Sequence, residues 1–429
     1  MAFQAESIGI IADDLTGAND TGLQFHLKGC NTQILFDATG EYNNKFSQAW
    51  AISTETRNLP PEKAAEKTFD VTKNILNNLN AEYIYKKIDS TLRGNIAVET
   101  LAILEATEYD AAIILPAFPQ EGRITVGGYH LLKGMPLERT EFARDPRSPI
   151  YESHIPTLLK SQIDNENLVG LIEFKTVSKG AGPILRELHN LINEGKKLIV
   201  VDSTSTTDME QVALAISKSN FNILPCGSAG LAQILAEEWF PNMNYQHIAK
   251  TIPQMPILVV SGSATSITKT QMLKLEEDED MDAYFIKITP DKLLDELYED
   301  LTERILNNLG KKNIVVLQAC QIENEDVKKF LTEKGLTPEK IPGLLTDYLA
   351  DLTRKVVAQK EVLLVLVGGE TSYKCCNAIT SRNLQIIDEV ETAIPLCMDH
   401  KAQWIVTKSG NLGNPKTLVN ILRYFEQHV

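Results

Sequence analysis

The sequence predicts an α/β fold of two domains, each with a mainly parallel sheet flanked by helices. The first observation behind this prediction is a repeated pattern, in which a short run of Ile, Val and Leu leads into a small polar loop and then a segment of helical period. The second is a proline-bearing stretch of little periodicity that separates two groups of these units. The third is the length of 429 residues, which is enough for each domain to bury its own core.

At least seven apolar runs are expected to be buried parallel strands. They are Ser7–Ala12, Tyr83–Ile88, Ala111–Leu115, Leu198–Val201, Ile223–Pro225, Ile257–Val260 and Leu363–Val367. In open α/β sheets, ligands bind outside the carboxyl ends of the strands. The polar loops that follow these runs are therefore the first place to look for a site.

The domain linker is expected between Trp239 and Pro256. This stretch reads WFPNMNYQHIAKTIPQMP, carries three prolines and precedes a new apolar run. We therefore place an N-terminal domain over 1–238, a linker over 239–256 and a C-terminal domain over 257–429.

Composition excludes several classes of protein. The 42 Lys and Arg against 57 Asp and Glu give a net charge of -15, which disfavours nucleic acid or an anionic membrane as a partner. Six scattered cysteines without a C-x-x-C pair indicate neither a zinc ribbon nor a disulfide framework, so a reducing cytoplasm is expected. The first residues lack a basic signal-peptide region, and no apolar run approaches the roughly 18 residues of a membrane span.

The loop after the first expected strand carries two adjacent carboxylates, Asp13 and Asp14. A carboxylate at the end of a strand can act as a general base or a metal ligand, and it can also simply cap the following helix. We expect one of the two to cap the helix and the other to take part in catalysis. Asp13 is favoured as the base, because Asp14 lies closer to the helix start.

The loop after the second expected strand, KKIDSTLRGN, is rich in charge. Arg93 is the side chain best built to hold a carboxylate in two parallel hydrogen bonds, although an ordinary salt bridge is an equal alternative. The next loop adds Gln120, Arg123 and His130, and a lone histidine is more often packed or solvated than catalytic. Together these loops predict a polar, cation-lined pocket for a small anion.

Three glycine-bearing loops in the C-terminal domain favour a nucleotide. They are Ser261–Thr265, Gly368–Ser372 and Ser409–Pro415, and exposed backbone N–H groups at such helix starts bind phosphate. Pro415 stands where a Walker A loop has glycine, so a P-loop enzyme is not supported. The absence of G-x-G-x-x-G, G-x-S-x-G and H-E-x-x-H counts against a nicotinamide dehydrogenase, a serine hydrolase and a zinc protease.

Six blocks of this sequence resemble the four-carbon acid sugar kinase family, in the right order and over nearly the whole chain. They are IADDLTGANDTG (11–22), KKIDSTLRGN (86–95), PAFPQEGRITVGGYHL (116–131), VSGSAT (260–265), GGETS (368–372) and KSGNLG (408–413). The resemblance implies ATP-dependent phosphorylation of a terminal hydroxyl on a tetronic acid. It implies that the N-terminal domain holds the acid sugar and the C-terminal domain holds ATP.

The resemblance also implies roles for particular residues, with ATP and Mg²⁺ as cofactors and no assigned metal ligand. The catalytic candidates remain Asp13 and Asp14. The expected substrate-binding residues are Arg57, Lys86, Lys87, Asp89, Ser90 and Arg93. The expected ATP-binding residues are Ser261, Ser263, Gly368, Gly369, Glu370, Thr371 and Gly410.

The DSTLRG form of the second block is similar to threonate and erythronate kinases rather than to the 3-oxo-tetronate branch. The expected reaction is transfer of phosphate to the 4-hydroxyl of D-threonate, with D-erythronate and then a 3-oxo-tetronate as alternatives. Tyr373–Cys376 departs from the small residues expected there, which leaves room for a sugar-acid-binding regulator without catalysis. The stereochemistry of the substrate and the oligomeric state, including a homo-oligomer, stay open.

Overall fold

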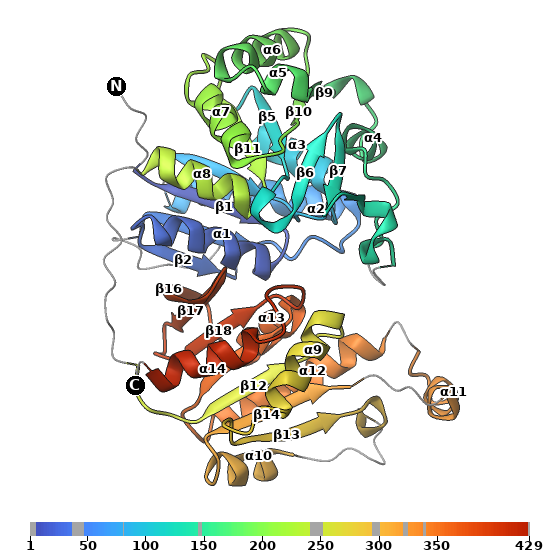
Figure 1. The fold of residues 1–429 in the computed structure, drawn as a ribbon, viewed down its shortest axis with the longest axis vertical. Helices are drawn as coiled ribbons and strands as arrows, with labels where there is room; N and C mark the ends of the chain where they lie inside the picture. The colour runs from blue at the N-terminus through green and yellow to red at the C-terminus, as the bar shows by residue number, and fades with distance from the viewer. Residues whose placement is uncertain are drawn as a thin grey trace. The chain divides into compact units, whose positions relative to one another are not determined.

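The computed structural model describes residues 6–36, 47–79, 81–144, 148–240, 252–293, 301–320, 325–337 and 340–427. The chain divides into two compact units, Met1–Gln246 and His247–Val429, which run from blue to green and from yellow to red in Figure 1. Each unit holds a mainly parallel sheet flanked by helices, so the predicted fold class is confirmed. Most of the expected linker lies outside the described residues.

The first unit contains a sheet in the order β2-β3-β1-β4-β11-β5-β10-β9, and neighbouring strands run parallel. Its strands are β1 (Ile8–Ala12), β2 (Thr32–Leu35), β3 (Ala49–Ser53), β4 (Tyr83–Lys87), β5 (Ala111–Leu115), β9 (Val169–Ile172), β10 (Leu198–Val201) and β11 (Ile223–Gly227). Nearly all strand residues are buried, because helices cover both faces. The five strands expected here are confirmed.

Two helical layers cover this sheet. The helices are α1 (Leu15–Leu27), α2 (Pro61–Asn74), α3 (Ile96–Ala106), α4 (Ile155–Ser161), α5 (Phe174–Val177), α6 (Ala181–Asn193), α7 (Thr206–Ser217) and α8 (Ala229–Trp239). Helices α2 and α3 pack together and bury Val71 and Ile103 against Ile52, Ile84 and Ile114 of the sheet. Helix α8 packs against both α1 and α7 in the other layer (Figure 1).

A small antiparallel sheet interrupts this pattern and was not expected from the sequence. It consists of β6 (Arg123–Val126), β7 (Tyr129–Leu132) and β8 (Met135–Pro136). The turn between β6 and β7 is made by Gly127 and Gly128, with φ of 58° and 76°. The buried carboxylate of Asp202, after β10, accepts hydrogen bonds from the backbone N–H of Gly127 (2.6 Å), Gly128 (2.9 Å) and Phe174 (2.8 Å). One carboxylate therefore anchors the hairpin to the main sheet.

The second unit contains a sheet in the order β13-β14-β12-β15-β18-β17-β16. Its strands are β12 (Ile257–Ser261), β13 (Ala283–Ile288), β14 (Ile314–Ala319), β15 (Leu363–Val367), β16 (Asn383–Glu391), β17 (Ile394–Asp399) and β18 (Trp404–Lys408). The expected strands β12 and β15 are confirmed. Strands β16 and β17 form an antiparallel hairpin. It was not predicted from the sequence, because no helix separates the two strands.

The helices of the second unit also form two layers. They are α9 (Ser266–Glu276), α10 (Thr302–Leu309), α11 (Glu325–Glu333), α12 (Ile341–Val357), α13 (Gly369–Ala378) and α14 (Thr417–Gln427). Helices α9 and α14 pack together and bury Met272 and Leu422 against Val259, Val365 and Val406. Helix α12 packs against α10 and α13. Among the described residues, no helix combines the length and the apolar character needed to cross a membrane.

Replacing Asp202 with alanine should destabilise the first unit. The change leaves three backbone N–H groups without their acceptor, and that of Gly128 is buried, so we expect the free energy of unfolding to fall by about 3 kcal/mol. Urea denaturation followed by circular dichroism measures this. Asp164→Ala, at an exposed position, is the control and should stay within about 0.5 kcal/mol of the parent. A loss below about 1 kcal/mol for Asp202→Ala would contradict the anchoring role.

Candidate functional site

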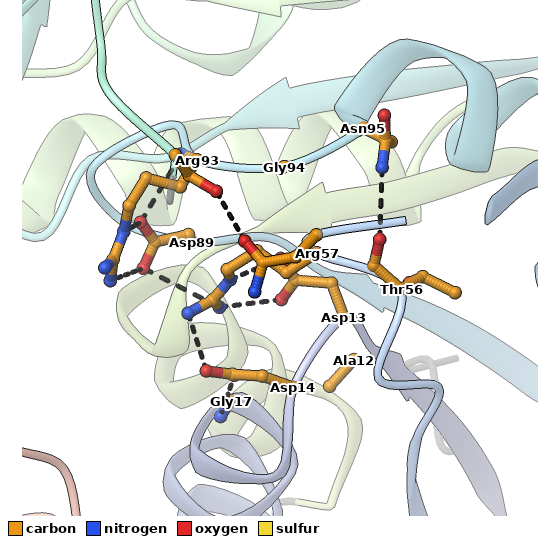
Figure 2. Close-up of polar contacts among 12 residues, drawn as sticks. Ala12, Asp13, Asp14, Gly17, Thr56, Arg57, Asp89, Arg93, Gly94 and Asn95 are labelled. Atoms are coloured by element: carbon orange, nitrogen blue, oxygen red, sulfur yellow. Dashed lines mark hydrogen bonds and ion pairs between the residues drawn. The ribbon is translucent and has the colours of Figure 1, made fainter. Parts of the chain in front are cut away.

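The guanidinium of Arg57 lies at the centre of a charged cluster in the first unit (Figure 2). Its Nε and Nη2 atoms each lie 2.8 Å from an oxygen of Asp13, and its Nη1 lies 2.6 Å from Asp14 Oδ2. These residues meet because the ends of β1, β3 and β4 are neighbours in register, Ala12 being paired with Ser53 and with Lys87. The carboxyl edge of the parallel sheet therefore gathers loops that are distant in the sequence.

Asp14 caps helix α1, as expected. Its Oδ1 accepts a hydrogen bond of 2.7 Å from the backbone N–H of Gly17, and its backbone is extended, as an N-cap requires. The carboxylate of Asp13 is almost fully buried and is held by the Arg57 fork. Burial raises the pKa of Asp13, but the attraction of Arg57 outweighs it and leaves that pKa below its usual value. Asp13 is thus an ionised, firmly oriented acceptor.

Asp89 and Arg93 form a second pair beside the first. Arg93 Nε lies 2.7 Å from Asp89 Oδ2 and Nη2 lies 3.3 Å from Oδ1, while Arg57 Nη2 approaches Asp89 at 3.8 Å. The hydroxyl of Thr91 also donates to Asp89. Burial raises the pKa of Asp89, but Arg93 and Arg57 together hold it well below its usual range. The bidentate group predicted to grip a ligand therefore already holds a carboxylate of this chain.

Close backbone approach shapes the loop that carries Arg93. Gly94 has φ of 96°, and a Cβ atom there would lie 2.9 Å from Asp13 Oδ2. The side chain of Asn95 donates to the carbonyl oxygens of Thr56 (3.1 Å) and Leu59 (2.9 Å), as Figure 2 shows for Thr56. These contacts join the loops after β3 and β4 into one platform.

The two lysines of β4 point to opposite faces of the strand. Lys86 is fully buried, and its Nζ lies 2.6 Å from Glu99 Oε2. It therefore affects the cluster through its positive charge, which helps to lower the pKa of Asp13. Lys87 Nζ lies 3.5 Å from Asp20 Oδ1. The cluster is polar, as predicted, but its cations alternate with carboxylates. It is therefore not the simply cationic pocket that the loop sequences suggested.

His130 contributes as a packed residue. Its Nε2 lies 3.0 Å from the carbonyl oxygen of Ser90, and its Nδ1 lies 2.9 Å from the Thr125 hydroxyl. Complete burial lowers the pKa of His130 to about 4, so the ring is neutral and Nε2–H donates to Ser90. Gln120 is exposed, and Arg123 lies 3.8 Å from Glu121. The hairpin thus supports the DSTLRG loop through one histidine.

Glu55 is a member of the cluster that the sequence analysis missed. Its Oε1 accepts hydrogen bonds from Leu15 N (2.9 Å) and Ser53 Oγ (2.6 Å), and its backbone has φ of 49°. Burial raises the pKa of Glu55 to about 7. Glu55 could have been found from its position just after the apolar run Ala49–Ser53, which forms β3 and was not among the expected strands.

The three glycine loops of the second unit lie together. The hydroxyls of Thr265 and Thr268 each donate to Gly410 O over 2.7 Å, which joins the loops after β12 and β18. The backbone N–H of Gly368 donates to Lys408 O over 2.8 Å, which joins the loop after β15 to the same cluster. The carboxyl edge of this sheet therefore gathers the loops of three neighbouring strands.

The loop after β12 approaches each of the other two loops so closely that an added side chain would collide. A Cβ atom at Gly262 would lie 2.4 Å from Thr371 Oγ1, and one at Gly410 would lie 2.3 Å from Ser263 Oγ. A side chain at either position would therefore displace one of these hydroxyl groups. The candidates Gly369, Glu370 and Thr371 form the first turn of α13, next to these contacts.

The unusual stretch Tyr373–Cys376 lies within α13, after the glycine loop. Cys375 and Cys376 are fully buried, and Cys375 Sγ lies 3.6 Å from the Thr353 hydroxyl of α12. The departure from small residues is thus accommodated where α13 packs on α12. Within the described part of the chain, no group of three or more His, Cys, Asp and Glu side chains is arranged to hold a metal ion.

Comparison with known proteins agrees with the division of the chain into two units. A sugar-binding N-terminal domain family matches residues 8–235, and a nucleotide-binding C-terminal domain family matches 258–418. A crystal structure of a Salmonella typhimurium LT2 protein shares the fold, with a TM-score of 0.81, 21% identity, and 97% of this chain and 99% of that chain covered.

Characterised relatives extend the likeness over nearly the full length. D-threonate kinase of Salmonella typhimurium is 29% identical, with 97% of this chain and 98% of the relative covered. D-erythronate kinase of Heliobacterium modesticaldum is 28% identical, with 97% of both covered. 3-oxo-tetronate kinase of Brucella melitensis is 26% identical, with 95% of this chain and 93% of the relative covered. With both domain families matched in order beside these kinases, the chain belongs to the four-carbon acid sugar kinase family.

Proposed function

We propose that this kinase transfers the γ-phosphoryl group of MgATP to the 4-hydroxyl of D-threonate, giving D-threonate 4-phosphate. The choice of D-threonate is supported by the sequence identity to named relatives. D-threonate kinases reach 29% and 30% identity over nearly the full chain, whereas the 3-oxo-tetronate kinases reach 24% to 26%. D-erythronate is the second candidate, since a D-erythronate kinase is 28% identical. A 3-oxo-tetronate is the third.

The charged cluster supports a role for the first unit in holding the acid sugar. A planar guanidinium is the donor best matched to a carboxylate, and Arg93 presents one at the strand ends. Its guanidinium also lies 5.6 Å from the centre of the Phe142 ring, which restricts its position. The substrate carboxylate would bind there in competition with Asp89. Ser90 and Lys87 would contact the sugar hydroxyls, and Arg57 would orient Asp13.

Asp13 is proposed as the carboxylate on the acceptor side. Phosphoryl transfer has a loose transition state, in which orientation and charge matter more than a strong base. A carboxylate that stays ionised and is fixed by Arg57 can accept a hydrogen bond from the acceptor hydroxyl and take its proton late in the reaction. The lowered pKa of Asp13 fits that late transfer.

The glycine loops of the second unit support nucleotide binding there. Ser261, Ser263, Gly368, Gly369, Glu370, Thr371 and Gly410 are the proposed contacts. Backbone N–H groups that no side chain covers can approach phosphate oxygens directly. We propose that Mg²⁺ arrives with the nucleotide phosphates, where it would neutralise charge during transfer.

The substrate assignment is tested by one kinetic screen. D-threonate, D-erythronate, L-threonate and 3-oxo-tetronates are offered with MgATP to one preparation, and ADP release is measured. We expect kcat/KM to be at least about tenfold higher for D-threonate, because a misplaced hydroxyl leaves buried polar groups unpaired. A higher kcat/KM for D-erythronate would show that D-erythronate, and not D-threonate, is the preferred substrate. No ADP with any acid would favour the non-catalytic regulator.

Replacing Arg93 with lysine should weaken acid-sugar binding alone. The variant keeps the charge but loses the planar fork, so the KM for the acid sugar should rise at least about tenfold while the KM for ATP changes less than about twofold. Steady-state kinetics with each substrate varied in turn measure both values. If the two KM values rise together, or only that for ATP does, Arg93 does not bind the acid sugar.

Asp13 and Asp14 should respond differently to substitution. Asp13→Asn keeps the shape but removes the charge, so kcat should fall by roughly 10²–10⁴ with the fold retained. Asp14→Ala removes the helix cap, so it should lower the free energy of unfolding by about 0.5–2 kcal/mol. Turnover and thermal unfolding are compared for both variants. Near-normal kcat in a folded Asp13→Asn protein would exclude Asp13 and direct attention to Asp89.

Gly410→Ala should weaken nucleotide binding. The added methyl group would lie 2.3 Å from Ser263 Oγ and 3.2 Å from its Cβ, so Ser263 must move from its place in the cluster. We expect the Kd for MgATP to rise about tenfold, which titration calorimetry measures. The control is Gly182→Ala on α6, where the nearest atom would be 3.8 Å from the new Cβ. Equal affinity in both variants would remove Gly410 from the site.

A further inference from the structure

The last residue of β18 is a buried lysine whose charge has no counter-ion among the residues that the structure describes. Lys408 is 1% exposed, and its Nζ donates one hydrogen bond of 2.8 Å, to the backbone carbonyl of Ser409. Within the described ranges it forms no ion pair, although an ammonium group has three N–H donors. A buried charge is costly unless it is paired, so the position calls for an anion.

A second buried polar group lies in the same row of the sheet. Ser261 on β12 is paired in register with Val367 on β15, and Val367 is paired with Lys408 on β18. Residues in register on neighbouring strands share a face, so the side chains of Ser261 and Lys408 flank Val367 on one side of the sheet. Ser261 is 1% exposed, and its Oγ has no hydrogen-bond partner among the described residues.

This row ends at the three joined glycine loops. The backbone carbonyl of Lys408 accepts from Gly368 N, and the next glycine, Gly410, is held by Thr265. An anion that entered the loops would therefore meet an ammonium and a hydroxyl that lack their full set of partners. We propose that Lys408 is the cation that binds the nucleotide phosphates, with Ser261 as a second donor. The proposal rests on the proposed kinase function and adds the residue that supplies positive charge on the nucleotide side.

In the described part of the chain, no carboxylate near Lys408 takes the place of such an anion. Burial alone lowers the pKa of Lys408 to about 7. The elements packed on or beside β18 carry these titratable side chains: Lys269, Lys274 and Glu276 on α9; Glu370, Tyr373, Lys374, Cys375 and Cys376 on α13; Arg423, Tyr424 and Glu426 on α14; Cys397 and Asp399 on β17. Glu370 pairs with Lys374, Arg423 pairs with Asp278, and Asp399 accepts from Ser381.

The decisive experiment compares nucleotides that carry different numbers of phosphates. Titration calorimetry measures the Kd of the full-length Lys408→Met protein for MgATP, MgADP and adenosine. We expect at least a thirtyfold rise in Kd for MgATP, a smaller rise for MgADP and less than a twofold change for adenosine. A change below threefold for MgATP, or an equal loss for adenosine, would overturn the proposal, the latter by showing that Lys408 only holds the fold of the loops.

Lys287→Met is the matched control for the loss of a lysine charge. Lys287 lies on β13 of the same unit, its side chain is 51% exposed, and it pairs with Glu276. Its Kd for MgATP should stay within twofold of the parent. A loss equal to that of Lys408→Met would show that the effect comes from the overall charge of the unit, which overturns the proposal.

A second measurement uses the unmodified protein and does not depend on the folding of a variant. Burial lowers the pKa of Lys408 to about 7, and phosphate favours its charged form, so binding should take up protons at pH 8 and fewer at pH 6. Calorimetry of MgATP binding in two buffers of different ionisation enthalpy gives the number of protons taken up. No uptake at pH 8 would overturn the proposal.

Failure of this inference is distinguishable from failure of the proposed function. If the parent protein releases ADP with a tetronate, but the Lys408→Met variant binds MgATP as tightly as the parent, only the inference about Lys408 is wrong. A parent protein that binds no MgATP overturns both.

Discussion

The pairing of Arg57 with Asp13 and Asp14 is the constraint on which the charged cluster of the first unit depends. Each carboxylate taken from water costs several kcal/mol in effective terms, and a cluster that also contains Asp89 would repel itself without a cation at its centre. The guanidinium supplies three directed contacts and so fixes the loops after β1 and β3 against each other. Parallel register makes this pairing available, because it brings the ends of β1, β3 and β4 side by side.

The two units use the same edge of an α/β sheet in opposite ways. In the first unit the strand ends carry charged side chains, and positive groups are matched with negative ones before any ligand arrives. In the second unit the strand ends carry glycines, and the backbone itself is presented. Side-chain charge suits a small acid with several hydroxyls, whereas exposed N–H groups suit phosphate oxygens. Lys408 departs from this pattern, since it is a buried lysine with no carboxylate beside it among the described residues.

Much of the fold and part of the site could be predicted from sequence. Runs such as Ala111–Leu115 and Leu363–Val367 are strands because their uniform apolarity fits burial on both faces. The capping role of Asp14 followed from its place just before a helix. The β6–β7 hairpin and the β16–β17 hairpin were missed, because both break the alternation of strand and helix. Glu55 was missed with them, since it follows a strand, β3, that the analysis had not identified.

The sequence by itself determined what depends on near neighbours along the chain: the seven uniformly apolar strands, the cap of α1, the glycine loops and the order of the family's blocks. Only the tertiary structure decided which charges pair. Arg57 meets Asp13 across 44 positions, and Thr265 meets Gly410 across 145. Local pattern carries no information on such partners, since the sheet order that unites them is set by the packing of the whole unit. That packing turned the expected cationic pocket into a cluster of alternating charges, and it left Lys408 buried with no anion beside it in the part of the chain that the structure describes.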